Sequence, residues 1–264
     1  MKVKKIAGAR CVKFRSLRYS GAKHLITTND AGCVKKGRIE GSARLSNLLL
    51  EAFGNDVTHF IIPEHGDRVL HVPAYIDGRS QMFRCDGLIH TIDLRPSKPR
   101  TWKPAVASCA TADCQFVMFS ADYLSPDLDS LRSIGLIHSG WRSCVKNIVG
   151  KAMAMLKQFG CPMSQLQVGL WGGICPKCYV VDEPVWKQLL PYHRYFTPAA
   201  DPKHWHLDLR GIVRQQLLDA GVKPRQISTS MFCSHCQRER NGNHVFASHR
   251  RGDAERNGIF IAAE

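Results

Sequence analysis

The sequence predicts a mixed α/β fold of the α+β kind, built as a single domain over residues 1–264. Strand-like and helix-like segments alternate irregularly along the chain, which is typical of mixed architectures. Hydrophobic residues make up 44% of the 264 residues, enough to bury a substantial core. Neither a low-complexity stretch nor a short-period repeat divides the chain, so nothing indicates a solenoid or a linker.

Four short apolar runs are predicted to be strands because they are rich in β-branched and aromatic residues. They cover residues 11–14, 57–62, 116–119 and 134–137. Residues 93–104 are rich in Pro, Arg and Lys and are predicted to form a loop.

Three segments repeat apolar residues at helical spacing and are predicted to be amphipathic helices. The third follows Asp208, whose side chain is suited to cap a helix N-terminus. The apolar faces are Leu45, Leu48, Leu49 and Phe53; then, after Trp141, Val145, Ile148, Val149, Ala152 and Leu156; and last Leu209, Ile212, Val213 and Leu217.

The chain is strongly basic, with 37 Lys and Arg against 22 Asp and Glu and a net charge of +15. A basic segment free of acidic residues covers about residues 1–23. No nucleic-acid-binding motif is present, so we interpret the charge as a solvated surface that gathers anionic substrates. A non-catalytic basic binding protein stays open as an alternative.

The eleven cysteines are an odd number at irregular spacing, which favours reduced thiols over a disulfide framework. No apolar run is long enough to span a bilayer, and the N-terminus lacks the apolar stretch of a secretory signal. We therefore expect a cytoplasmic protein with no membrane partner.

Two short segments carry the strongest chemical signal: Thr111-Ala-Asp-Cys114 and His138-Ser-Gly-Trp-Arg142. Together with His65, which follows a predicted strand, they place one Cys and two His at strand ends. Such a set either holds a catalytic zinc or, through Cys114 and His138, forms a nucleophile–base pair. Arg142 adds a fixed positive charge suited to phosphate or carboxylate. A buried Cys with hydrogen-bonded core His is the alternative without function.

Several motifs in a fixed order resemble the YfiH family, also called peptidoglycan editing factor, laccase-like polyphenol oxidase or zinc-dependent purine nucleoside phosphorylase. The likeness runs from about Arg44 to the C-terminus, and ordered motifs are more specific than any single one. Besides the two segments above, they are Glu64-His65-Gly66-Asp67-Arg68-Val69, Asp86-Gly87-Leu88-Ile89-His90-Thr91, Gly173-Ile174-Cys175-Pro176-Lys177-Cys178-Tyr179, Leu207-Asp208-Leu209, Cys233-Ser234-His235-Cys236 and Ser248-His249-Arg250-Arg251.

The resemblance implies a layered αββα arrangement and a zinc ion held by His65, Cys114 and His138. It implies phosphorolysis of purine nucleosides, with adenosine deamination as a companion activity. Arg142, Cys178 and Arg250 match substrate-binding positions. The implied partners are a purine nucleoside and phosphate, with no dedicated nucleic acid, in a monomer or weak homodimer.

Three positions depart from the family pattern: Pro63 stands for Gln, Val180 for Glu and Val213 for Asn. They remove polar groups that would contact substrate. The choice of substrate therefore stays open. One alternative is an amide hydrolase with Cys114 as nucleophile and His138 as base, which fits the editing of cell-wall precursors that the family's other name implies. Another is a copper-dependent polyphenol oxidase, which we disfavour because multicopper sites need repeated His-x-His patterns and the chain has only His204-Trp205-His206.

Two Cys-x-x-Cys pairs, Cys175 with Cys178 and Cys233 with Cys236, offer ligands for a four-cysteine zinc site. The separation between the pairs is longer than the usual spacing of such sites. The resemblance also accounts for both pairs by position. We therefore do not expect a second metal site.

Overall fold

The computed structural model describes residues 2–7, 9–14, 17, 21–29, 43–54, 57–72, 79–95, 106–127 and 129–263, and two large sheets dominate this part of the chain. The seven-stranded sheet runs in spatial order β1 (Lys2–Ile6), β2 (Ala9–Lys13), β3 (Ala22–Thr27), β16 (Asn257–Ala263), β8 (Val106–Thr111), β4 (Thr58–Ile62) and β6 (Gln81–Arg84). The six-stranded sheet runs β15 (Ile227–Thr229), β11 (Gln167–Trp171), β9 (Gln115–Leu124), β10 (Ser130–Ser139), β7 (Gly87–Asp93) and β5 (Val69–His71).

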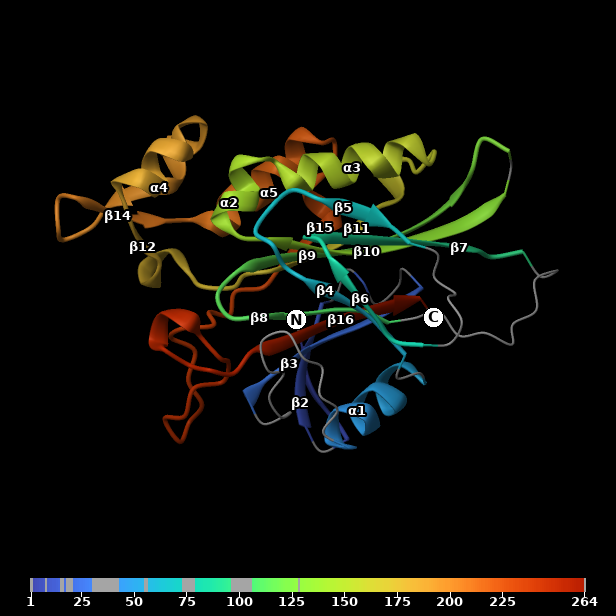
Figure 1. The fold of residues 1–264 in the computed structure, drawn as a ribbon, viewed down its shortest axis with the longest axis horizontal. Helices are drawn as coiled ribbons and strands as arrows, with labels where there is room; N and C mark the ends of the chain where they lie inside the picture. The colour runs from blue at the N-terminus through green and yellow to red at the C-terminus, as the bar shows by residue number, and fades with distance from the viewer. Residues whose placement is uncertain are drawn as a thin grey trace.

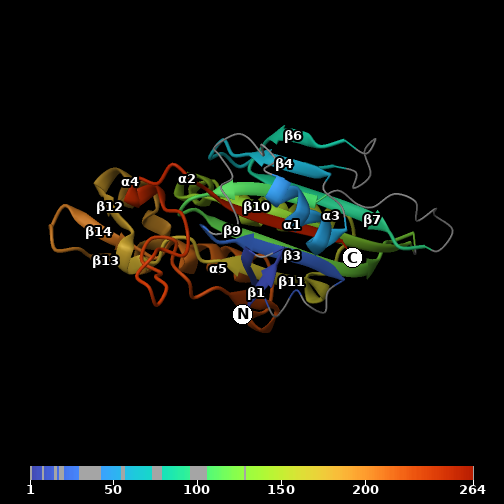
Figure 2. The ribbon, with the colours of Figure 1, turned by 90° about the horizontal axis from the view of Figure 1, so that it is seen from below.

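Helices cover the outer face of each sheet (Figure 1). The six-stranded sheet carries α2 (Trp141–Val145), α3 (Ile148–Gln158) and α5 (Leu209–Asp219). The seven-stranded sheet carries α1 (Ala43–Phe53), which lies in front of that sheet when the molecule is seen from below (Figure 2). The layers are thus helix, sheet, sheet and helix, which confirms the mixed α+β class and the αββα arrangement.

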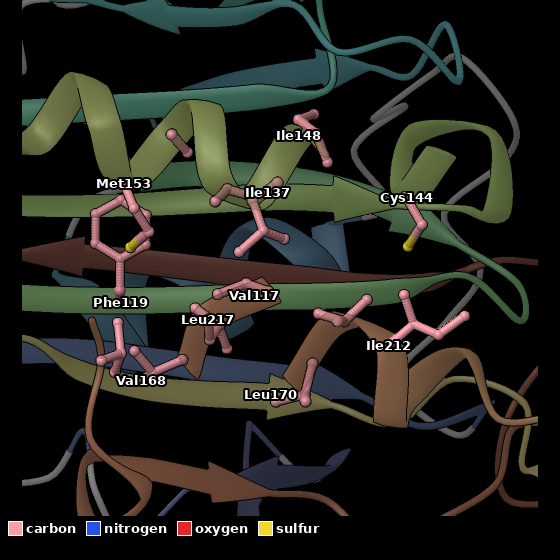
Figure 3. Packing of buried hydrophobic residues seen from close by; sticks show 14 of the residues in the cluster. Val117, Phe119, Ile137, Cys144, Ile148, Met153, Val168, Leu170, Ile212 and Leu217 are labelled. Carbon is pink, nitrogen blue, oxygen red and sulfur yellow. The ribbon is translucent and has the colours of Figure 1, made fainter. Parts of the chain in front are cut away.

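Alternation along the central strands explains why the two sheets stack. In β9, Val117 and Phe119 point to the helices, whereas Phe116 and Met118 point to the other sheet. Figure 3 shows the layer between the six-stranded sheet and its helices, in which Val117 and Phe119 belong to one buried cluster. The cluster also includes Ile137, Ile148, Met153, Ile212 and Leu217.

A third buried cluster joins α1 to the seven-stranded sheet. Leu48 and Leu49 of the helix are buried together with Phe60 and Phe260 of the sheet. A separate three-stranded sheet extends from one end of the molecule (Figure 1). It consists of β12 (Val180–Asp182), β14 (His204–Leu207) and β13 (Phe196–Pro198), with α4 (Glu183–Gln188) beside it.

The predicted strands correspond to β2, β4, β9 and β10, and two of the three predicted helices correspond to α1 and α5. Asp208 caps α5, since its carboxylate accepts a hydrogen bond from the Gly211 N–H at 2.9 Å. The helix expected after Trp141 is instead two helices. Asn147 has a φ of 52°, a left-handed conformation that interrupts the helix between α2 and α3. Val145, at the end of α2, is 39% exposed rather than part of the buried face.

The ten cysteines in the described ranges are all free thiols, as the composition predicts. In the same ranges, no helix combines the length and the apolar character needed to cross a bilayer. Most of the predicted 93–104 loop lies outside the described residues. The basic N-terminal segment contributes β1, β2 and the start of β3 to the seven-stranded sheet.

Candidate metal centre

Three strand ends bring His65, Cys114 and His138 together. His65 lies three residues beyond β4, Cys114 lies between β8 and β9, and His138 lies near the end of β10. Their potential ligand atoms all lie within 4.8 Å of one another. The two imidazole rings are nearly perpendicular, at 88°, with centroids 5.1 Å apart. The sulfur and the two imidazoles are thus close enough to contact one ion together.

Asp86 organises the two histidines and is fully buried. Its Oδ1 accepts hydrogen bonds from the His138 Nδ1–H at 2.8 Å and the His65 backbone N–H at 2.9 Å. Its Oδ2 accepts from the backbone N–H of Gly66 at 2.8 Å and of Glu64 at 3.3 Å. One carboxylate therefore fixes the His138 ring and the turn that carries His65. Nδ1 of His138 is engaged, so Nε2 is the nitrogen left for a metal.

The turn at His65 has a left-handed backbone, with φ of 57°. Such a conformation is uncommon for a residue other than glycine, and surrounding contacts must hold it. The three backbone N–H groups that donate to Asp86 are those contacts. His65 remains exposed to solvent, whereas His138 is buried at the base of the centre.

Gly140 leaves room beside the three candidate ligands. A Cβ placed on Gly140 would lie 3.4 Å from His65 Cδ2, 3.5 Å from Cys114 Sγ and 3.7 Å from His138 Cε1. Any longer side chain at this position would therefore stand directly against all three candidate ligands, and glycine avoids this.

The Cys114 thiol and the His138 imidazole shift each other's pKa. Burial would raise the pKa of Cys114, but the positive charge of His138 and hydrogen bonds from His138 and His65 outweigh it and lower that pKa to about 6. Burial would lower the pKa of His138, but the charge of Cys114 and the hydrogen bond to Asp86 raise it to about 9. Burial would likewise raise the pKa of Asp86, yet the hydrogen bond from His138 lowers it, so this carboxylate stays ionised. The centre thus supplies a thiolate, the form that binds metals.

Asp113, next to Cys114, holds the C-terminal loop. Its carboxylate accepts hydrogen bonds from the Ser234 hydroxyl at 2.6 Å, the Ser248 hydroxyl at 3.1 Å and the Arg250 backbone N–H at 2.8 Å. These bonds fix the backbone of Arg250 close to the candidate ligand Cys114.

Both candidate substrate-binding arginines are exposed and rest on aromatic rings. The Arg142 guanidinium lies 4.3 Å from the Trp141 ring centroid at the start of α2, directly after Gly140. The Arg250 guanidinium lies 5.2 Å from the Tyr179 ring centroid. Burial and, after it, the negative charge of Cys114 raise the pKa of Tyr179. Neither arginine is used by an ion pair that the structure describes.

Cys178 takes part in a different group. Its Sγ lies within 4.8 Å of the sulfurs of Cys175, Cys233 and Cys236, and this set is separate from the His65 centre. A substrate contact by Cys178 stays a prediction. We expected no second metal site at the two Cys-x-x-Cys pairs, yet the fold brings their sulfurs together, because β11 and β15 are parallel neighbours and deliver both pairs to one end of the six-stranded sheet.

Asp86 is the residue that sequence reasoning missed. It stands within a quoted motif, directly before β7, but nothing in its spacing links it to His138, which is 52 positions away. The available signal was a lone acidic residue beside Cys85 at the start of a buried strand, where an unpaired carboxylate would be costly. Val213, in contrast, is fully buried in the hydrophobic core, so its departure from the family pattern does not alter the surface of the centre.

The αββα layers and the His-Cys-His centre define a protein of the YfiH and YlmD type. A family profile described as multi-copper polyphenol oxidoreductase laccase matches residues 43–263, and the chain belongs to this family, the YfiH family.

Curated relatives carry enzyme names at low identity. The chain is 26% identical over 225 residues to a purine nucleoside phosphorylase of Xylella fastidiosa, covering 83% of this chain and 74% of the relative. It is 26% identical over 204 residues to an adenosine deaminase, RL5, from an unknown prokaryotic organism, covering 74% and 72%. It is 32% identical over 146 residues to purine nucleoside phosphorylase YlmD of Geobacillus stearothermophilus, where the match spans 48% of that protein.

Solved structures show the same fold. YlmD from Geobacillus stearothermophilus superposes with a TM-score of 0.73 at 23% identity, covering 99% of this chain and 98% of that one. YfiH from Bacillus licheniformis superposes with a TM-score of 0.70 at 21% identity, covering 94% of each chain.

Proposed function

We propose that this protein is a zinc-dependent enzyme that cleaves purine nucleosides with phosphate and also deaminates adenosine. The observation that carries the proposal is the cluster of one thiolate and two imidazoles, against which Gly140 places no side chain. Three protein ligands with an open fourth position are the pattern of catalytic zinc. The enzyme names of the relatives support the same substrate class.

The donor set fits the ion. Cys114 offers a thiolate, His138 offers Nε2 because Asp86 engages Nδ1, and His65 offers a ring on the solvent side. A zinc ion bound there would supply a Lewis acid and lower the pKa of a coordinated water toward neutrality. The family description names copper, and one Cys with two His also occurs in copper sites, so the metal is part of what must be measured.

Arg142 and Arg250 are the residues that we propose bind phosphate. In phosphorolysis, a phosphate oxygen forms a bond to the ribose C1′ while the bond to the purine nitrogen breaks and the base leaves with a proton. Arg142 and Arg250 are exposed cations without an ion pair in the described structure, so both are free to hold the phosphate in line. In deamination, water adds at C6 of adenine and ammonia leaves, and no anion has to be held.

Turnover assays with defined metal content test the proposal. Protein stripped of metal and reloaded with zinc is mixed with adenosine, inosine or guanosine, with and without phosphate, and the products are separated. We expect base and ribose 1-phosphate only when phosphate is present, and inosine from adenosine in either case. Absence of turnover with all three nucleosides in the zinc form contradicts the proposal, as does activity that needs copper and a phenol.

A second candidate is an amide hydrolase with Cys114 as nucleophile and His138 as base. The observation that favours it is the thiolate–imidazolium pair, in which the pKa of Cys114 is about 6 and that of His138 about 9. A nucleophilic thiolate cannot also be a saturated metal ligand. Full alkylation of Cys114 in protein that retains its zinc supports the hydrolase, whereas protection by zinc supports the metal centre.

A further inference from the structure

Four cysteine sulfurs from two distant segments meet at one end of the molecule, apart from the His65 centre. Cys175 directly precedes the short helical turn Pro176–Cys178 and Cys178 ends it, and Cys233 and Cys236 lie in the loop after β15. All four Sγ atoms lie within 4.8 Å of one another. We propose that these four cysteines bind a structural zinc ion that holds the C-terminal loop in place.

The distances between the sulfurs fit one central ion. Four thiolates at the usual zinc–sulfur bond length of about 2.3 Å stand about 3.8 Å apart at the corners of a tetrahedron. The Cys175 and Cys236 sulfurs are 4.0 Å apart. A disulfide needs about 2.05 Å and joins sulfurs in pairs, whereas here the four form a single mutual cluster.

The backbone around the sulfurs supports thiolates. The Cys175 backbone N–H donates to the Cys233 Sγ at 3.2 Å, a hydrogen bond that stabilises negative charge on sulfur. The two segments are also tied together directly, because the Ser234 N–H donates to the Gly173 carbonyl at 2.9 Å. The cluster is thus preformed by the fold.

Arginine side chains brace both segments and bring positive charge to the cluster. The Arg210 guanidinium donates to the carbonyl of Gly172 at 3.1 Å and to that of Phe232 at 3.2 Å, just before each Cys-x-x-Cys pair. Arg251 donates to the His235 carbonyl at 2.6 Å, between the second pair. A zinc with four thiolates carries a net negative charge, so cations held at the two segments stabilise it.

Four protein ligands leave no open coordination position, so the proposed role is structural. Cys236 is exposed and gives the ion a path from solvent. Cys233 is buried and directly precedes Ser234, whose hydroxyl donates to Asp113. The ion would therefore fix the loop that Asp113 holds beside Cys114.

Metal counting tests this proposal independently of any enzyme activity. Protein is purified under reducing conditions without chelator or added metal, and its metals are quantified per chain. We expect two zinc ions in the wild type, one in the double variant Cys175→Ser/Cys236→Ser and one in His65→Ala. The matched control Lys177→Ser changes an exposed residue within the same turn and keeps two.

Cobalt substitution distinguishes the two sites. The His65→Ala variant keeps all four cysteines, so it tests the four-cysteine site even if the double cysteine variant misfolds. Cobalt bound to His65→Ala should show the intense sulfur-to-metal absorption of four thiolates, and its removal should lower the melting temperature. A single zinc in the wild type that His65→Ala abolishes would overturn the proposal. So would disulfides among the four cysteines in protein prepared without oxygen, or iron in place of zinc.

Discussion

Replacement of Asp86 by Asn tests how the centre would hold the proposed zinc ion. The four hydrogen bonds to this carboxylate come from N–H donors only, two to each oxygen. The amide of Asn keeps one oxygen and introduces an NH₂, so either orientation points a donor at two donors. If the His138 ring changes tautomer to accept at Nδ1, then Nε2 becomes protonated and cannot bind a metal.

Asp86→Asn should lower both the zinc affinity and the stability of the fold. Loss of a partner that orients a metal-ligating histidine typically weakens metal binding by 10- to 100-fold, or about 1.4–2.8 kcal/mol. The lost charge-assisted hydrogen bonds also destabilise the fold, by about 1.5–3 kcal/mol for each bond. We therefore expect Asp86→Asn to fold with a lower melting temperature and to bind zinc 10- to 100-fold more weakly.

Competition with a chromophoric chelator measures the zinc dissociation constant of the metal-free variant. Asp67→Asn is the matched control, because it removes the same charge two residues from His65 but only breaks an ion pair with Lys151 on the surface. Zinc affinity of Asp86→Asn within threefold of the wild type, at equal folded fraction, would refute the reasoning about the His138 tautomer.

Three further predictions concern Cys114, Arg142 and the buried His90. Cys114→Ala should lose one zinc and all nucleoside turnover, and metal content together with product analysis checks both; retention of that zinc points to the cysteine hydrolase. Arg142→Ala should keep its zinc and lose phosphate-dependent cleavage more than deamination, whereas equal loss of both indicates a structural arginine. Burial lowers the pKa of His90 to about 4, so its contribution to stability is full above the unfolded pKa of 6.5 and is lost as the pH falls toward 4. Unfolding free energies between pH 7 and pH 4.5 should fall by roughly 2.4 kcal/mol more in the wild type than in His90→Asn, and parallel curves would count against this assignment.

Local pattern was enough to predict the elements that position the centre. Helical spacing and a capping residue predicted α5, and apolar runs predicted β4, β9 and β10, because these signals act over neighbouring residues. The break at Asn147 was not predicted, since a left-handed residue leaves no periodic trace in an otherwise helical pattern.

The features that the sequence did not predict depend on contacts between residues far apart in the chain. The likeness in motif order selected His65, Cys114 and His138, but no pattern linked Asp86 to His138 or joined the two Cys-x-x-Cys pairs. The distance along the chain says little about the distance in space once parallel strands such as β11 and β15 lie side by side. Asp86 and the four-cysteine cluster therefore became visible only in the tertiary structure.

The position of β16 has a consequence for the order of folding. This strand pairs with β3 on one side and β8 on the other, so it joins β1–β3 to the rest of the seven-stranded sheet. During synthesis the first three strands emerge early but cannot enter that sheet until residues 257–263 leave the ribosome. Such late closure between distant segments slows folding and exposes strand edges in the meantime. Nascent chains stalled before β16 should therefore recruit chaperones and aggregate more than the finished chain.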